Sequence, residues 1–189
     1  MAWRITNRMR PRDGFLRNTR GSAALEFAML APAFFALLFS MFEIGITYAA
    51  DALLQNAINE TARLIRTGQA QGAGMTRQQF RDEVCERINV LLSCDERLEI
   101  DVREFNRFAD ASFEDPLDAN GHFRDDFRYE PGSACSVVLV RGFYAWSPMT
   151  PTLGSFLANM ADGDRVIQVT TAIRNEPFNN GQSGCASLG

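Results

Sequence analysis

The stretch Gly21-Ser22-Ala23-Ala24-Leu25-Glu26-Phe27 opens an apolar run that continues to Tyr48. Between residues 27 and 42 this run contains no charged side chain. An α-helix rises about 1.5 Å per residue, so a helix of about 20 residues crosses a hydrocarbon core of about 30 Å. The stretch therefore predicts a transmembrane helix over residues 22–50.

The charges on the two sides of this helix have opposite signs. Residues 1–21 carry a net charge of +5, whereas residues 68–189 carry 11 Arg against 18 Asp and Glu. Basic residues stay on the cytoplasmic side of a membrane helix, so we expect residues 1–21 to be a cytoplasmic leader or tail. Residues 51–189 are then a domain outside the cytoplasmic membrane. Their net acidity argues against a nucleic-acid partner.

A cleaved secretory signal peptide is the alternative to a stable membrane helix. Such a peptide has an apolar region of about 7–15 residues and a small-residue exit site. Thr47-Tyr48-Ala49 is a poor exit site, the apolar run is too long, and helical patterning continues past it. The sequence therefore favours a stable anchor.

A basic residue, a glycine, an acid, a proline and a second acid follow one another in a recognisable order. Gly21, four residues and then Glu26-Phe27 resemble a type IV prepilin cleavage site. The stretch from Arg20 to about Gly68 resembles the TadE-like proteins, which are pseudopilins of the tight-adherence (Flp) pilus assembly system. The residues that carry this resemblance are Arg20 to Ala28, Pro32, Phe42 to Gly45, Leu54 to Ala57, Ala62 and Arg63.

The resemblance implies that a prepilin peptidase of the bacterial inner membrane cuts between Gly21 and Ser22. It also implies that Glu26 and Phe27 take part in subunit docking. A Glu26 carboxylate can pair with the freed Ser22 amine of a neighbouring subunit, and such a pair fixes the axial register because an unpaired charge is costly in lipid. The alternative is a solvated Glu26 at the membrane interface, and Glu43 is expected to mark the outer headgroup edge.

Residues 51–67 are expected to continue the membrane helix as an amphipathic stem. One apolar stripe recurs at the helical period and should pack on the outer domain. The Gly-rich residues 68–74 predict a flexible break, and Thr76 with Gln79 predicts a capping box that starts a second helix. The stem stripe comprises Leu54, Ile58, Ala62 and Ile65, and the second helix presents Phe80, Val84, Ile88, Leu91 and Leu92.

Three further segments predict strands. Residues 98–105 alternate apolar residues with Glu99, Asp101 and Arg103, which indicates a half-buried strand. Residues 136–146 predict a central strand with a bulge at Gly142, and residues 165–174 predict a third strand. A long acidic loop (residues 106–134) and a short helix (residues 148–161) connect them. The predicted fold class is α+β, with the stem packed on a small domain containing a short antiparallel sheet.

Four cysteines, Cys85, Cys94, Cys135 and Cys185, all lie on the predicted outer side. In an oxidising compartment an even count indicates two disulfides, for which three connectivities are open. Our first expectation is Cys85–Cys94 with Cys135–Cys185. A metal site is weakly supported, because there is no C-x-x-C and His122 is the only histidine. The acids around Asn120-Gly121 do not have the spacing of a calcium loop.

The sequence contains no nucleophile elbow and no phosphate-binding loop, so we expect neither an enzyme nor a cofactor. The resemblance implies a minor, pseudopilin-like structural component of pilus assembly, with its outer domain in the periplasm. The implied partners are the membrane, other pilus or pseudopilin subunits, inner-membrane assembly proteins and the prepilin peptidase. No nucleic acid or small-molecule substrate is expected. The alternative is a permanently anchored envelope module that binds or senses a ligand through the acidic loop.

Overall fold

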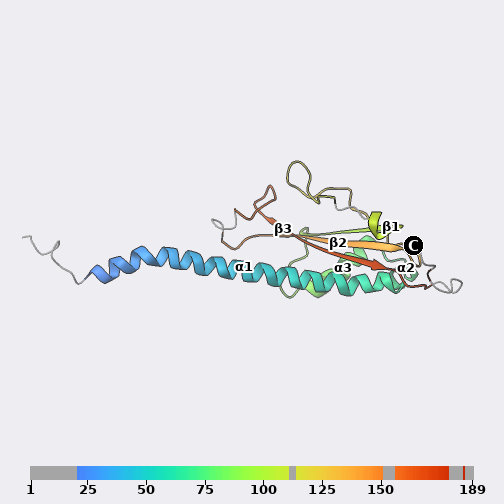
Figure 1. Cartoon of the computed structure of the whole chain (residues 1–189), viewed down its shortest axis with the longest axis horizontal. Coiled ribbons are helices and arrows are strands. Elements are labelled where there is room, and N and C mark those ends of the chain that lie inside the picture. The colour runs from blue at the N-terminus through green and yellow to red at the C-terminus, as the bar shows by residue number, and fades with distance from the viewer. Residues whose placement is uncertain (1–20, 111–113, 151–155, 179–184, 186–189) are drawn as a thin grey trace, which may run out of the picture. The chain divides into compact units, whose positions relative to one another are not determined.

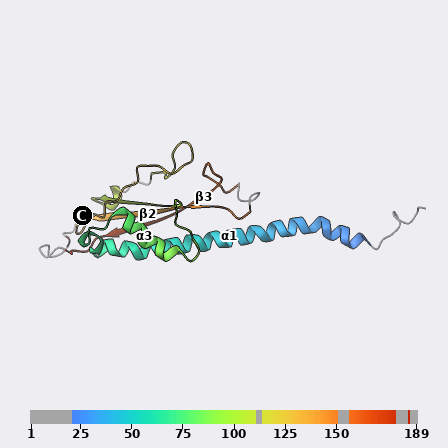
Figure 2. The ribbon, with the colours of Figure 1, turned by 180° about the vertical axis from the view of Figure 1, so that it is seen from behind.

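The computed structural model describes residues 21–110, 114–150, 156–178 and 185. The described elements are helices α1 (Ser22–Arg66), α2 (Gln69–Gly72) and α3 (Arg77–Ile88), strands β1 (Leu98–Phe105), β2 (Val137–Trp146) and β3 (Arg165–Arg174), and a short 3-10 helix, η2 (Phe108–Asp110) (Figures 1 and 2). The chain divides into two units, Met1–Ser40 and Met41–Gly189, with the division inside α1.

Helix α1 is 45 residues long and holds Pro32 without ending there. Within the described residues it is the one helix that is long and apolar enough to cross a membrane. The core helix of a soluble protein can be equally long and apolar, but such a helix is mostly buried. Only 6% of this apolar stretch is buried. A signal sequence near an N-terminus also meets the test on length and composition.

The second half of α1 forms the predicted stem. Leu54, Ile58 and Ile65 are fully buried, and Ala62 joins them on the same stripe. Helix α3 begins at the predicted capping box, in which the Thr76 side chain accepts from the Gln79 backbone and the Gln79 side chain accepts from the Thr76 backbone. The apolar stripe of the stem and the buried side chains of α3 form one core with the inward side chains of the sheet, such as Ile100, Val140 and Val169.

The three strands form one antiparallel sheet in the order β1-β2-β3. Val102 pairs with Val140, and Val140 pairs with Thr171. The C-terminal half of α1 and helix α3 lie beside this sheet, as both ribbon views show (Figures 1 and 2). The predicted α+β fold, with a long apolar N-terminal helix and a short antiparallel sheet, is confirmed.

The reason for a glycine at position 142 differs from the one expected. The predicted bulge is wrong, because the register runs unbroken through Gly142 on both sides of β2. A Cβ atom placed on this glycine would lie 2.9 Å from Ile58 Cδ1 and 3.2 Å from Val169 Cγ2. The glycine lets the stem helix approach the middle strand closely.

Three local predictions are also wrong. Residues 68–74 are not a continuous flexible break, because α2 occupies Gln69–Gly72 and buries Ala70. Leu91 lies on the surface rather than on the buried face of α3, because the helix ends at Ile88. The short helix predicted over residues 148–161 is not formed in its described part, because residues 148–150 and 156–161 are not helical. Residues 151–155 lie outside the described part.

Candidate functional site

The N-terminal end of α1 carries the residues that the sequence singles out for processing and docking. Gly21 precedes the first helical residue, Ser22, and both are exposed. Glu26 follows Ser22 by four residues, so the two side chains share one face of the helix. Glu26 and Phe27 are exposed, which leaves both available to another molecule.

The fold gives no reason for a glycine at position 21. A Cβ atom there would meet nothing within 4 Å in the described part of the chain. Gly21 is also not among the glycines with a positive φ, such as Gly68, Gly74 and Gly121. A side chain could be accommodated at Gly21, as it could at Gly45.

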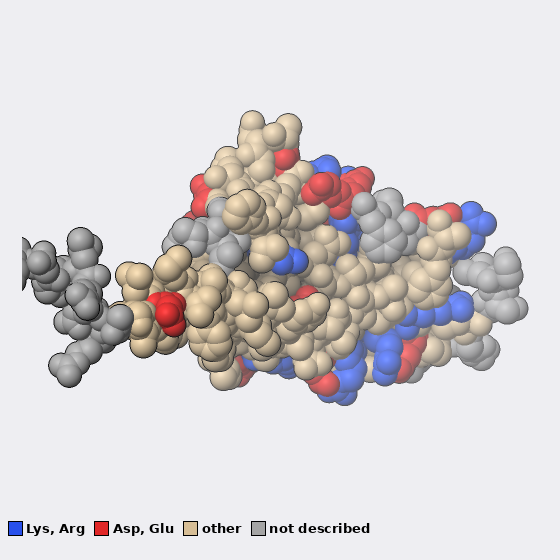
Figure 3. Space-filling view, turned by 60° about the vertical axis from the view of Figure 1, so that its left-hand side comes forward, with Lys and Arg blue, Asp and Glu red and all other residues tan. Residues whose placement is uncertain are grey.

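The first half of α1 presents an almost continuous apolar surface. From residue 22 to residue 42 all the side chains are exposed or half-buried. The surface of α1 next to its N-terminal end is mostly uncharged in the space-filling view (Figure 3). A surface of this kind is stable in lipid or against other apolar helices, and not in water. The large apolar side chains on it are Leu25, Phe27, Met29, Leu30, Phe34, Phe35, Leu37, Phe39, Met41 and Phe42.

Glu43 is the first buried residue of α1, with a side chain exposed to only 4%. Its carboxylate accepts hydrogen bonds from the backbone N–H of Met149 at 3.0 Å and of Thr150 at 3.1 Å. The Thr150 hydroxyl donates a third, at 3.2 Å. Several N–H and O–H donors on one carboxylate satisfy a buried acid without a cation.

The sequence predicts a place at the outer headgroup edge for Glu43, with a helix contact as the alternative, and does not predict this bond to a distant loop. The partners lie 106 and 107 residues further along the chain. They are backbone groups, which carry no signature in the sequence. The one available signal is an isolated acid that interrupts an apolar helical run, and it shows that a partner is needed but not which one.

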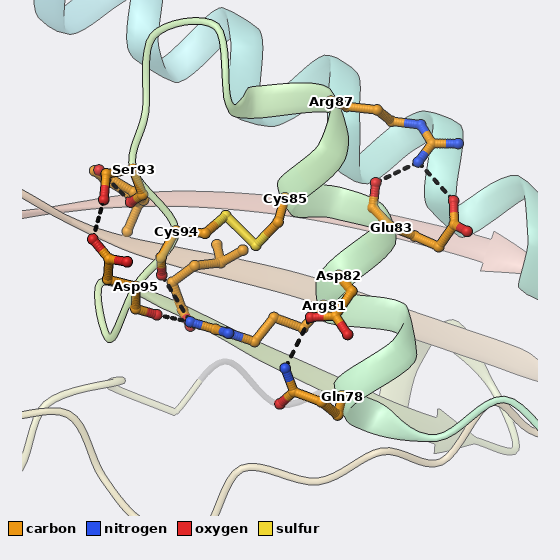
Figure 4. Close-up of a disulfide and its surroundings, with 11 residues drawn as sticks. Gln78, Arg81, Asp82, Glu83, Cys85, Arg87, Ser93, Cys94 and Asp95 are labelled. Atoms are coloured by element: carbon orange, nitrogen blue, oxygen red, sulfur yellow. Dashed lines mark hydrogen bonds and ion pairs between the residues drawn. A yellow bond between two sulfur atoms is a disulfide. The ribbon is translucent and has the colours of Figure 1, made fainter.

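Two disulfides lie in the unit Met41–Gly189, and they join the pairs expected first, Cys85–Cys94 and Cys135–Cys185. The first connects α3 to the segment before β1 (Figure 4). Beside it, the Arg81 side chain donates to the backbone carbonyls of Cys94 and Leu98 at 2.7 Å and 3.0 Å. The position of α3 on the sheet is therefore fixed by a covalent and a polar link.

The sheet contains a buried ion pair that the alternation of β1 does not predict. Asp101 and Arg141 face each other across β1 and β2, and both are buried. Arg141 Nε lies 3.1 Å from Asp101 Oδ2, and Arg103 Nε lies 3.0 Å from the same oxygen. The backbone N–H of Arg128 donates to Asp101 Oδ1 at 2.8 Å. The expectation that Asp101 faces solvent is wrong, because the loop after β1 covers this face.

The carboxylates of the acidic loop are largely engaged within the chain. Asp118 accepts from the backbone N–H groups of His122 and Asn120, and the hydrogen bond from His122 is the largest cause that lowers the pKa of Asp118. Asp126 pairs with Arg124. Among the described residues no three His, Cys, Asp or Glu side chains lie close enough to hold a metal ion.

The similarity of this chain to known proteins lies in its N-terminal part. No curated protein and no solved structure matches the chain. A family model described as TadE-like protein matches residues 21–63, from the exposed glycine through Glu26 and Glu43 to the stem. The resemblance predicted from the sequence is thereby confirmed for this stretch, and residues 21–63 are similar to TadE-like protein.

Proposed function

We propose that this chain is a membrane-anchored structural component of tight-adherence pilus assembly, similar to a minor pseudopilin. In this proposal α1 crosses the bacterial inner membrane once, with residues 1–21 in the cytoplasm and residues 51–189, including the stem 51–67, in the periplasm. The chain is a substrate of the prepilin peptidase rather than an enzyme. The observation that carries the proposal is the match of residues 21–63 to TadE-like protein on a helix whose apolar face is exposed.

Three further observations support this orientation and role. The basic N-terminal segment agrees with the positive-inside rule. The two disulfides lie in the proposed periplasmic part, and disulfides persist in an oxidising compartment. The exposed Glu26 and Phe27 offer a neighbouring subunit one acid and one aromatic ring on an apolar helix.

Subunit docking through Glu26 is tested by the substitution Glu26→Gln, scored by surface pili. Glu60→Gln is the matched control, because Glu60 is also an exposed acid on α1. We expect Glu26→Gln to abolish assembly while the protein accumulates normally, and Glu60→Gln to leave it intact. Normal piliation with Glu26→Gln contradicts the docking role.

Processing after Gly21 is tested by mass spectrometry of the protein extracted from membranes. We expect a mature N-terminus at Ser22, and we expect Gly21→Val to retain the full leader. Gly45→Val is the control, because a Cβ atom at Gly45 also meets nothing within 4 Å. An intact Arg-rich N-terminus in the unmodified protein contradicts processing and favours a permanently anchored envelope module.

A further inference from the structure

An apolar cluster lies on the surface of the unit Met41–Gly189, apart from its core. Phe156 is exposed to 87%, and Met149 and Leu157 are exposed as well. Ile44 and Tyr48, also exposed, belong to the second unit's part of α1. We name these five residues the apolar rim. Large apolar side chains grouped on a surface indicate an interaction site.

Three members of the rim line one hollow, Met149 is bonded to α1, and Phe156 precedes Leu157 in the chain. Ile44, Tyr48 and Leu157 line the same open hollow of about 470 Å³, together with Arg165 and the start of β3. Met149 is fixed against α1 by Glu43, whose carboxylate accepts the Met149 backbone N–H. The loop and the helix therefore present their apolar side chains together.

The position of the rim along α1 indicates which partner it contacts. From Ser22 to Glu43 the helix rises about 30 Å, which is about the thickness of a hydrocarbon core. If α1 spans the membrane as proposed above, Glu43 lies at the level of the headgroups on the side from which the helix emerges. Met149, whose backbone N–H donates to Glu43, then lies near the same level.

We propose that the apolar rim docks into the interface of the lipid bilayer, so that its loop residues Met149, Phe156 and Leu157 form a membrane contact beside that of α1. Aromatic side chains are enriched at this level of the membrane, where Tyr places its ring among acyl chains and its hydroxyl among headgroups. The same hollow is lined by one cation, Arg165, and one acid, Asp51, and Arg165 supplies the cation for lipid phosphate. Glu43 acts as a positioning residue, because it holds the loop at the point where the helix leaves the hydrocarbon.

The test places a photoreactive benzoylphenylalanine at Phe156 in the full-length chain, in vesicles of phosphatidylethanolamine and phosphatidylglycerol. Val90 is the matched control position, because it is an apolar residue exposed to 90% that lies outside the rim. After irradiation, mass spectrometry identifies what each position has captured. We expect lipid adducts at position 156 that exceed those at position 90 by at least about tenfold.

Three results would overturn this inference: capture of a second copy of the chain at position 156, no adduct at position 156, or equal lipid capture at both positions. A wash in alkaline carbonate distinguishes failure of the rim proposal from failure of the proposed function, on which the rim proposal rests. If the chain stays in the membrane without a lipid adduct at position 156, only the rim proposal fails. If the wash releases the chain, the membrane-spanning role of α1 fails first.

Discussion

At the scale of single residues, Glu43 connects two segments that are far apart in the sequence. Replacing it with alanine removes the acceptor of the Met149 and Thr150 N–H groups and leaves both amides without their carboxylate partner. We expect Glu43→Ala to speed hydrogen exchange at these two amides by at least about tenfold, since a hydrogen bond to a charged group contributes about 1.5–3 kcal/mol. Glu60→Ala is the control, and unchanged exchange in Glu43→Ala contradicts the anchor.

Tyr129 gives a pH-dependent prediction. Burial raises the pKa of Tyr129 to about 12 from an ordinary value of 10.0, and its hydroxyl has no hydrogen-bond partner in the described part of the chain. The neutral form stabilises the fold fully below pH 10, and this contribution is lost as the pH rises from about 10 through 12. We expect Tyr129→Phe to be at least as stable at pH 7 and to lose less stability over this window, as measured by chemical denaturation in detergent. An identical alkaline loss in both proteins contradicts the assignment.

At the scale of elements, the pairing of β1 with β2 contains the buried ion pair of Asp101 and Arg141. Removing one partner leaves the other charge buried and uncompensated, which costs about 3–5 kcal/mol. We expect Asp101→Asn to destabilise the unit Met41–Gly189 by this amount. The double variant Asp101→Leu/Arg141→Met should recover part of the loss, because Arg141 no longer leaves a buried charge and Arg103 keeps Glu114, although the Arg128 N–H loses its acceptor. A double variant as unstable as Asp101→Asn would contradict this account of the pair.

The elements also show which features a sequence can predict. The stem stripe, the capping box of Thr76 and the strand at residues 98–105 follow from periodicity and local hydrogen bonding, and the structure confirms all three. The burial of Asp101 does not follow, because alternation assumes that one face of the strand meets water. Here Arg141 and the loop near Arg128 cover that face.

The candidate site likewise contains local features that a sequence predicts and non-local contacts that it does not. The order of Gly21, Glu26 and the apolar run is local, so a sequence is enough to recognise it. The anchor of Glu43 is not local, because its partners are main-chain groups of a loop whose helical pattern is misleading. The packing of Ile58 against Gly142 likewise depends on two elements meeting in space.

At the scale of the whole molecule, the two disulfides are expected to contribute unequally. Cys85 and Cys94 are 9 residues apart, whereas Cys135 and Cys185 are 50 apart. Loop-closure entropy predicts a loss of about 2.5 kcal/mol for the pair Cys85→Ala/Cys94→Ala and about 4 kcal/mol for Cys135→Ala/Cys185→Ala. Denaturation monitored by circular dichroism measures both, and the reverse order contradicts a stabilisation that acts through the unfolded chain.

The topology of the chain decides whether the rest of the account can hold. All four cysteines are in disulfides, so a single introduced thiol at the exposed Ala109 reports its own accessibility. The measurement is labelling of Ala109→Cys with a membrane-impermeant maleimide in intact spheroplasts, followed by an alkaline carbonate wash. The account predicts labelling before permeabilisation and a labelled chain that stays with the membranes. Labelling only after permeabilisation, or release of the chain by the wash, would contradict it.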